Sequence, residues 1–100
     1  MARAKTTRQP TITAAISEAV GRVAANVRSL RQARNLTQER LAEEAGVDTT
    51  LVQLVERMAT NPRLATLTRL ARALDTDVQA LLAPAPRPKA NPPGRPRSRS

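Results

Sequence analysis

The sequence contains no cysteine, no histidine and no aromatic residue among its 100 positions. Without cysteine and histidine it cannot form disulfides, thiolate or imidazole metal sites, or a catalytic Ser-His or Cys-His pair. The eight acidic residues lie mostly in helix-like contexts. We therefore expect neither an enzyme nor a protein with a bound metal or cofactor. Any hydrophobic core must be built from aliphatic side chains and methionine.

Long hydrophobic runs are also missing. No segment approaches the length of a membrane span, and no apolar stretch follows the basic start as it would in a signal peptide. These absences favour a cytoplasmic protein. The length fits one small domain with extended ends.

Charge is distributed unevenly along the chain, whose net charge is +9. Residues 1–35 hold seven basic residues and one acidic, and residues 83–100 hold five basic residues and none acidic. The centre, residues 36–82, holds five basic and seven acidic residues, a net charge of −2. Basic ends attract polyanions, most commonly nucleic acid in the cytoplasm, although charge can also serve solubility alone.

Apolar residues near the start recur every three or four positions, which predicts one face of a helix through about residue 33. They are Ile12, Ile16, Val20, Val23, Val27 and Leu30. This stripe fits either a face packed on the core or a short coiled-coil seam. Gly21 interrupts it and is a candidate boundary between a short leading helix and the main one. Residues 1–10 are polar and basic, and we expect a disordered arm there.

The centre of the chain, from Leu36, reads LTQERLAEEAGVDTTLVQLVER and predicts two short helices joined by a tight turn. Thr37 and Asp48 can each cap the start of a helix with a side-chain oxygen. Gly46 can adopt the left-handed conformation that ends the first helix. We expect these helices at about 38–45 and 49–58, in the order of a helix-turn-helix motif.

Two further helices and a tail are expected after the motif. One apolar face, formed by Leu64, Leu67, Leu70, Ala71 and Leu74, predicts a fourth helix. Asp77 can cap a short fifth helix. The fold class is then all-α: a compact five-helix domain over 11–82 with an N-terminally extended first helix. Residues 83–100, rich in proline and arginine, are expected to be a disordered basic tail that either binds phosphate or only aids solubility.

Candidate DNA-binding residues follow from this arrangement. Val52 and Val55 should face the core, so the opposite face of the third helix would meet the major groove. The side chains expected to face bases are Thr49, Thr50 and Gln53. Glutamine can pair with adenine N6 and N7, and threonine offers a hydroxyl and a methyl group suited to thymine. Candidate contacts to the DNA backbone are Gln38, Arg57 and Arg63.

From Val23 to Leu82 the sequence resembles the phage-repressor-like (lambda-repressor-like), Xre-type helix-turn-helix family. The matching segments are VAANVRSLR (23–31), LTQERLAEEAGV (36–47), VER (55–57) and NPRLATLTRLARALDTDVQALL (61–82). The resemblance implies a five-helix domain whose third helix reads operator DNA, usually as a dimer. It also implies a phosphate contact for Gln38 and a place for Arg63 in a loop that often approaches the DNA backbone. The base-facing positions that it implies are Thr49, Thr50 and Gln53. Arg31 and Glu56 match a structural ion pair between the first and third helices in several members.

The sequence departs from this family at several positions. Leu51 and Leu54 stand where family members generally have polar or basic side chains. Met58 and Asp75 replace glycines that usually follow the third and fourth helices. Leu51, Leu54 and Met58 would form an exposed apolar strip that contacts thymine methyl groups or binds a protein partner. A rotated third helix, which would turn these side chains into the core, is the third interpretation.

The sequence thus predicts a DNA-binding transcriptional regulator, in the first instance a repressor, that acts on double-stranded DNA as a homodimer associated with the nucleoid. No small-molecule ligand is indicated. One alternative is a protein-interaction module or antitoxin that retains the fold. Another is a nucleoid-type protein that binds DNA through its basic ends with low specificity. Whether residues 12–20 extend a dimer interface stays open at this stage.

Overall fold

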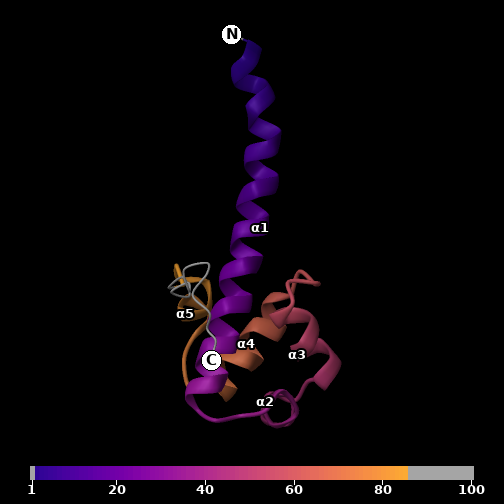
Figure 1. The fold of residues 1–100 in the computed structure, drawn as a ribbon, viewed down its shortest axis with the longest axis vertical. Coiled ribbons are helices and arrows are strands. Elements are labelled where there is room, and N and C mark those ends of the chain that lie inside the picture. Colours follow the sequence, from indigo (N-terminus) through magenta and orange to yellow (C-terminus); the bar gives the residue numbers. More distant parts are fainter. Residues whose placement is uncertain (1, 86–100) are drawn as a thin grey trace, which may run out of the picture.

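The computed structural model describes residues 2–85, with side chains from Thr11 onward. Within this part there are five helices and no strand: α1 (Ala2–Ala33), α2 (Gln38–Ala45), α3 (Thr49–Glu56), α4 (Leu64–Ala73) and α5 (Val78–Leu82). Figure 1 shows α2–α5 gathered around the C-terminal half of α1, while its N-terminal half extends far beyond them. The predicted all-α, five-helix fold is confirmed. No helix of the described part is long and apolar enough to cross a membrane.

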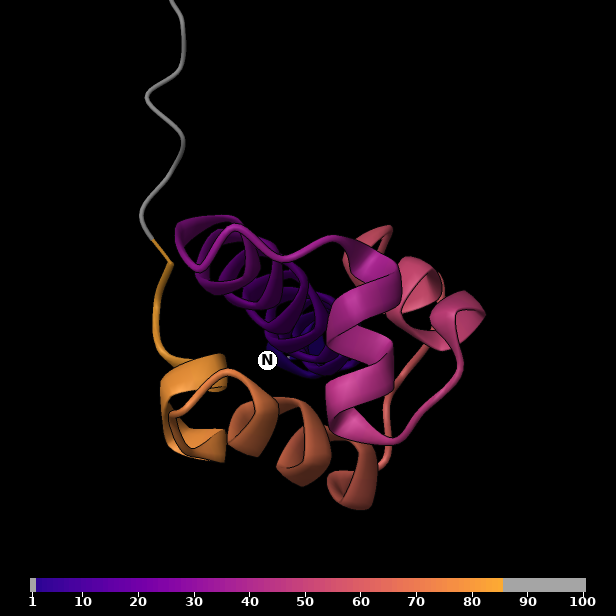
Figure 2. The same cartoon turned by 90° about the horizontal axis from the view of Figure 1, so that it is seen from below.

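The hydrophobic core lies between the C-terminal half of α1 and the other four helices. Figure 2 looks along α1 and shows the other helices beside it. α1 packs on α3 and α5, α2 packs on α3 and α4, and α4 packs on α5. The largest fully buried side chains are Val27, Leu41, Val52, Val55, Leu70 and Leu81. All six are aliphatic. Val27 and Leu70 lie on the faces that the three- and four-residue spacings predicted to be buried, and Val52 and Val55 face the core as predicted.

α1 is longer and more continuous than the helix that the apolar spacing predicted. Its bounds begin at Ala2, so they include most of the polar segment over residues 1–10 that was expected to form a basic arm. Nucleating a helix fixes several residues for one hydrogen bond, but propagating an existing helix fixes one residue per bond. A polar segment joined to an amphipathic helix can therefore continue it. α1 also passes through Gly21 without a break. The disordered tail predicted for residues 83–100 falls on residues 86–100 outside the described part of the chain. The domain boundaries at 11 and 82 stay predictions.

Gly21 has a packing role in place of the predicted helix boundary. A Cβ atom built on Gly21 would lie 3.3 Å from the Cε atom of Met58. Glycine therefore allows the Met58 side chain to approach α1 closely. The sequence alone carried no sign of this contact, because the two residues lie 37 positions apart in the chain.

Four helices end in the same way, with one residue in the left-handed region. These residues are Asn35 (φ 56°), Gly46 (φ 73°), Met58 (φ 60°) and Asp75 (φ 61°). In each case the amide of the next residue donates to the carbonyl five positions earlier, at 2.8–3.0 Å. This pattern is the Schellman motif, which satisfies carbonyls that the helix leaves unpaired. Met58 and Asp75 thus adopt the backbone of the glycines they replace, at a cost of roughly 1–2 kcal/mol for a residue with a Cβ.

α1 also holds the end of α5. The Asn26 side-chain amide donates to the carbonyls of Leu81 (2.9 Å) and Ala83 (2.8 Å). Arg22 reaches the carbonyl of Leu82 at 3.5 Å. The last carbonyls of a helix have no partner within it, so these side chains complete the end of α5 and fix it against α1.

Candidate nucleic-acid interface

The turn between α2 and α3 has the backbone that its sequence predicts. Thr37 precedes α2 in an extended conformation, and its hydroxyl accepts a hydrogen bond from the Arg40 amide at 3.0 Å. Gly46 ends α2 in the left-handed region. A Cβ atom at Gly46 would lie 3.3 Å from Arg69 Nη1, so glycine also makes room for an arginine of α4 beside the turn. Both predicted signals, the cap and the glycine, are confirmed.

α3 starts at the predicted residue and ends two residues earlier than predicted. Asp48 has the extended backbone of an N-cap, but its side chain makes no capping hydrogen bond. The last helical residue is Glu56 instead of Met58, because Met58 adopts the left-handed conformation that terminates the helix. Val52 and Val55 are buried, which fixes the inner face of α3 on the core.

The outer face of α3 carries the side chains predicted to read bases. Thr50 is exposed, whereas Thr49 and Gln53 are half-buried. With 100° between successive residues, Thr50 and Gln53 lie within about 60° of each other and away from the buried valines. Arg57, exposed at the C-cap of α3, falls on the same side. Thr49 lies at the edge of this face. The contact of these residues with bases stays a prediction.

The predicted apolar strip is not a continuous exposed surface. Leu51 is half-buried and packs against the core, and Leu54 is also half-buried. Met58 is 48% exposed, but its methyl group lies next to Gly21 on α1. Leu51 is drawn inward because it lies only about 40° from Val55 around the helix, at the border of the buried face. Leu51 therefore belongs partly to the core. Contact of Leu51, Leu54 and Met58 with DNA or with a protein partner stays a prediction.

A buried carboxylate ties α3 to α1 and α2. Glu56 has a fully buried side chain, and Arg31 donates two hydrogen bonds to it: Nε to Oε2 at 2.7 Å and Nη2 to Oε1 at 3.1 Å. Arg31 also donates to the carbonyl of Leu36 at 2.8 Å. Gln38 Nε2 donates to Glu56 Oε1 at 3.0 Å. The ion pair implied by the family resemblance is present, and it joins three helices instead of two.

The ionisation of Glu56 reflects this network. Burial raises the pKa of Glu56 because a charge loses its hydration. The hydrogen bonds from Arg31 and Gln38, together with the charges of Arg31 and Arg28, outweigh burial and hold the pKa below its ordinary value. Glu56 is therefore a charged, fully partnered group at neutral pH, and it holds α3 in place.

Gln38, predicted to contact the DNA backbone, is instead engaged within the protein. Its amide nitrogen already donates one hydrogen bond to Glu56. A side-chain amide carries two hydrogens, so one donor remains for a phosphate at the N-terminus of α2. The bond to Glu56 fixes the direction of that donor. Contact with DNA stays a prediction for Gln38, as it does for Arg63, which is exposed at the N-cap position of α4.

Two arginines beside the motif were missed by the sequence reasoning. Arg28 lies one turn before Arg31 on α1, with Nε 3.6 Å from Glu56 Oε1, and about half of its side chain is exposed. The three-residue spacing from Arg31 was a signal that both arginines share one face. Arg69 lies beside the turn at Gly46, and nothing in the sequence indicated this long-range approach. In the described part of the chain, no three acidic side chains gather as they would around a metal ion.

Known proteins share this motif and its surroundings. The HTH_3 helix-turn-helix family matches residues 27–81. The control protein C.SmaI of Serratia marcescens is 50% identical over 60 residues, which cover 60% of this chain and 71% of that protein.

Solved structures agree with this match. The restriction-modification controller protein C.AhdI from Aeromonas hydrophila superposes with a TM-score of 0.60 and 37% identity, over 62% of this chain and 94% of that one. The hypothetical transcription factor NHTF from Neisseria gives a TM-score of 0.64 and 35% identity, over 66% of this chain and 76% of that one. An HTH_3 family transcriptional regulator from Vibrio cholerae gives a TM-score of 0.64 and 26% identity, over 68% of this chain and 38% of that one. On the family match over residues 27–81, and in agreement with its Xre-type motif, the chain belongs to the HTH_3 helix-turn-helix family.

Proposed function

We propose that this protein is a sequence-specific transcriptional regulator of double-stranded DNA, acting as a homodimeric repressor that reads the major groove with α3. The observation that carries the proposal is the attachment of α3 to the domain. Val52 and Val55 seal its inner face, and Glu56 fixes its C-terminal end through Arg31. A helix held in this way presents Thr50 and Gln53 to a groove with little freedom to reorient, as base recognition requires.

Phosphate contacts would come from the edges of the motif. Residues 36–82 have a net charge of −2, so the domain surface alone gives little general attraction to DNA. Arg57 and Arg63 are exposed near the C-terminal end of α3 and at the start of α4. Arg28 is half exposed and, like Gln38, approaches Glu56 Oε1. These side chains suit backbone contacts that fix the register, and the basic ends add sequence-independent affinity.

The relatives favour regulation over catalysis. C.AhdI is described as a restriction-modification controller, and NHTF as a transcription factor. By analogy, we include the control of restriction-modification genes among the targets of this protein. Such a regulator works on chromosomal or plasmid DNA, that is, in the cytoplasm at the nucleoid, and it binds DNA without a chemical reaction of its own.

The test is a selection of bound sequences from random duplex DNA, followed by binding measurements over a salt series. We expect an enriched palindrome with half-sites about one helical turn apart. The Thr50→Ala protein should lose discrimination at one position of each half-site, by roughly 5- to 150-fold per base contact. Thr68→Ala, the same change on an exposed face of α4, is the matched control and should leave the preference intact.

Two rival functions are separated by the same measurements. A nucleoid-type protein would enrich no sequence and would lose most of its affinity when residues 84–100 are deleted, whereas a specific regulator keeps its site preference. An interaction module would co-purify with a stoichiometric protein partner, and Leu54→Asp would abolish this co-purification. The absence of sequence preference at every salt concentration would refute the proposed function.

A further inference from the structure

Two arginines of α1 approach the buried carboxylate of Glu56 in different ways. Arg31 is committed within the protein: two of its nitrogens donate to Glu56, a third donates to the carbonyl of Leu36, and its side chain is only 13% exposed. Arg28 lies one turn earlier, with Nε 3.6 Å from Glu56 Oε1 and 54% of its side chain exposed. Within the described residues Arg28 has this ion pair but no hydrogen bond. Its guanidinium donors are therefore available to a ligand.

Gln38 brings a second donor to the same carboxylate oxygen. Its Nε2 donates to Glu56 Oε1 at 3.0 Å, which leaves one of the two amide hydrogens for another acceptor. Arg28 Nε and Gln38 Nε2 both approach Oε1, so these two nitrogens lie no further apart than the distances of 3.6 and 3.0 Å laid end to end. An N–H···O hydrogen bond spans about 2.9 Å, so one phosphate placed beside both groups can accept from both.

The charges of this cluster do not cancel. Arg28 and Arg31 carry two positive charges, and Glu56 carries one negative charge. Arg31 neutralises Glu56 through two hydrogen bonds, so the surplus positive charge lies on the half-exposed Arg28. A phosphodiester of DNA carries one negative charge, and the planar guanidinium fork matches the spacing of its oxygens. The surplus charge and the free donors thus fit a single backbone phosphate.

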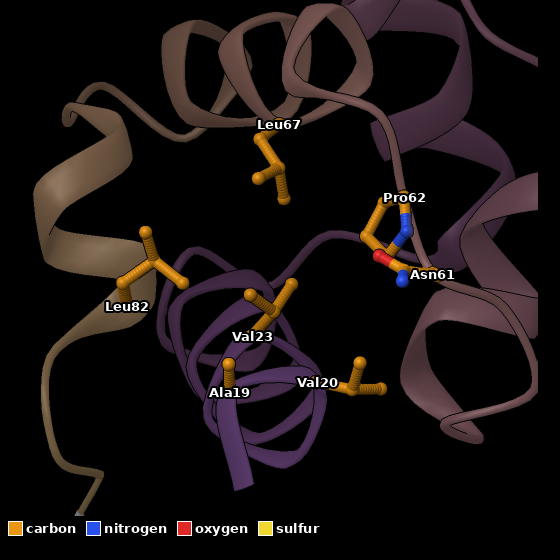
Figure 3. A pocket seen from close by; sticks show the side chains of 7 residues that line it. All are labelled: Ala19, Val20, Val23, Asn61, Pro62, Leu67 and Leu82. Carbon is orange, nitrogen blue, oxygen red and sulfur yellow. The ribbon is translucent and has the colours of Figure 1, made fainter. Parts of the chain in front are cut away.

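A hollow elsewhere along α1 offers a different chemistry. Its volume is about 70 Å³, and it opens between α1, α4, α5 and the loop before α4. Figure 3 shows aliphatic side chains of these elements around it, with Asn61 of the loop as its polar side chain. The residues that line it include no charged one, so it has nothing to hold an anion. Of these two features of α1, the cluster at Glu56 is the one that suits a phosphate.

We propose that Arg28 and Gln38 bind one and the same phosphate of the DNA backbone, and that Glu56 is the positioning residue for both side chains. Glu56 holds Arg28 by its charge and Gln38 by a hydrogen bond, and the donors that remain serve the phosphate. Long side chains lose rotamer freedom when they bind, and side chains that are already held lose less. This inference rests on the proposed function, because it concerns the same complex with DNA.

The shared phosphate has a defined place relative to α3. Glu56 is the last residue of α3, so a phosphate bound by its two partners lies close to the C-terminal end of that helix. Contacts to phosphate fix the register of a protein on the duplex but carry no sequence information. Arg28 therefore contributes affinity for every DNA sequence and does not discriminate between bases.

The first experiment measures affinity over a salt series, for the operator selected from random duplex DNA and for random duplex DNA itself. Arg28→Ala should weaken binding roughly 10- to 100-fold on both and reduce the salt slope by about one, with the base preference unchanged. Arg72→Ala is the matched control, because it removes the same charge from an exposed residue near the C-terminal end of α4. It should alter affinity and slope clearly less. Circular dichroism checks that both variants keep the fold.

The second experiment locates the phosphate. Single phosphates of the operator duplex are replaced in turn by uncharged methylphosphonate, and the affinity for each duplex is measured. At the phosphate that Arg28 binds, the replacement should weaken the wild type but leave Arg28→Ala unaffected. Gln38→Ala should lose much of its sensitivity at the same phosphate, whereas Arg72→Ala should keep the wild-type profile. Sensitivity lost at two different phosphates would overturn the shared site.

The third experiment tests the positioning role of Glu56. Glu56→Gln keeps the shape of the side chain and one acceptor oxygen but removes the charge that holds Arg28. In this background, Arg28→Ala should cost about threefold less affinity, or less still, than it costs in the wild type. An equal cost in both backgrounds would overturn the positioning role. Arg28→Lys decides the same point without a change at Glu56: it keeps the charge but lacks the fork, so it should restore the salt slope and not the full affinity.

The remaining outcomes separate this inference from the proposed function. Sequence-specific binding that Arg28→Ala and Arg72→Ala weaken equally would overturn the phosphate contact and leave the proposed function standing. Binding without sequence preference would refute the proposed function, while a loss of salt slope confined to Arg28→Ala would still support the phosphate contact. Competition by inorganic phosphate, beyond that of chloride at the same ionic strength, would assign the site to a free anion and overturn the proposal.

Discussion

The ion pair at the centre of the fold can be tested by removing one partner and then both. Arg31→Met keeps an unbranched side chain but leaves Glu56 buried without the two hydrogen bonds and the charge that Arg31 supplies. The Glu56 side chain is fully buried and that of Arg31 is 13% exposed, so neither is screened by water as a surface pair would be. Breaking a buried pair by removing one partner costs about 3–5 kcal/mol, because an uncompensated charge is left inside.

Removing the charge as well should restore much of this loss. The double variant Arg31→Met, Glu56→Leu has no buried charge, and replacing a buried pair by apolar residues of similar volume is often neutral or stabilising. Gln38 then loses its acceptor, which costs about 1 kcal/mol if the amide turns to solvent. We expect the double variant to lie within about 2 kcal/mol of wild type and well above the single variant.

The pH dependence gives an independent readout with a defined sign. In the wild type the pKa of Glu56 lies below its ordinary value of 4.5. Its ionisation therefore stabilises the fold above that pH, and this contribution is lost as the pH falls through the folded pKa. In Arg31→Met, burial still raises the pKa of Glu56, but the hydrogen bonds and charge of Arg31 that lowered this pKa are gone. That variant should instead gain stability as the pH falls from 7 toward 4.5, because protonation removes the buried charge.

The measurement is urea unfolding at several pH values, with protein concentration held fixed. Comparing each protein with its Glu56→Leu counterpart cancels the contributions of the other carboxylates. A cost below about 1 kcal/mol for Arg31→Met would mean that the pair behaves as an exposed one. A double variant no more stable than Arg31→Met would mean that the unpaired charge is not the cause of the loss. Either result refutes the reasoning.

Two further predictions concern the ends of helices. Thr37→Ala should lower the free energy of unfolding by about 1 kcal/mol, because the hydroxyl caps α2. Asp48→Ala should cost clearly less, since its side chain makes no capping hydrogen bond; equal losses in urea unfolding would contradict the assignment. Asp75→Gly should raise stability by about 0.5–1 kcal/mol, because this exposed residue has φ 61°. In thermal unfolding, Asp75→Gly should raise the melting temperature, whereas Asp77→Gly should lower it because it removes the side chain that caps α5.

Much of the fold was predictable because its signals are local. Thr37 and Gly46 act on the backbone within three or four residues of themselves, and both behave as the sequence predicted. The three- and four-residue spacing of aliphatic residues likewise identified the buried faces. Asp48 shows the limit of such signals. It has the extended backbone of an N-cap, but its side chain makes no capping hydrogen bond, so the position of an aspartate before a helix does not by itself predict that bond.

The site was harder to predict because it depends on contacts between distant parts of the chain. Gln38 binds Glu56 across 18 positions, and Met58 packs near Gly21 across 37. The spacing of apolar residues along the chain does not indicate which distant residues come into contact. Leu51 illustrates a second limit, since a residue at the border of a buried face can turn either way, and here it packs against the core.

α1, α2 and α3 are joined at one buried carboxylate. Arg31, near the C-terminal end of α1, donates two hydrogen bonds to Glu56 of α3, and Gln38 of α2 donates to the same side chain. Because the Glu56 side chain is fully buried, α3 cannot turn about its own axis without breaking these bonds or exposing an unpaired charge. The proposed reading of bases by Thr50 and Gln53 would therefore depend on Arg31 and Glu56, although the Glu56 side chain itself is closed to solvent.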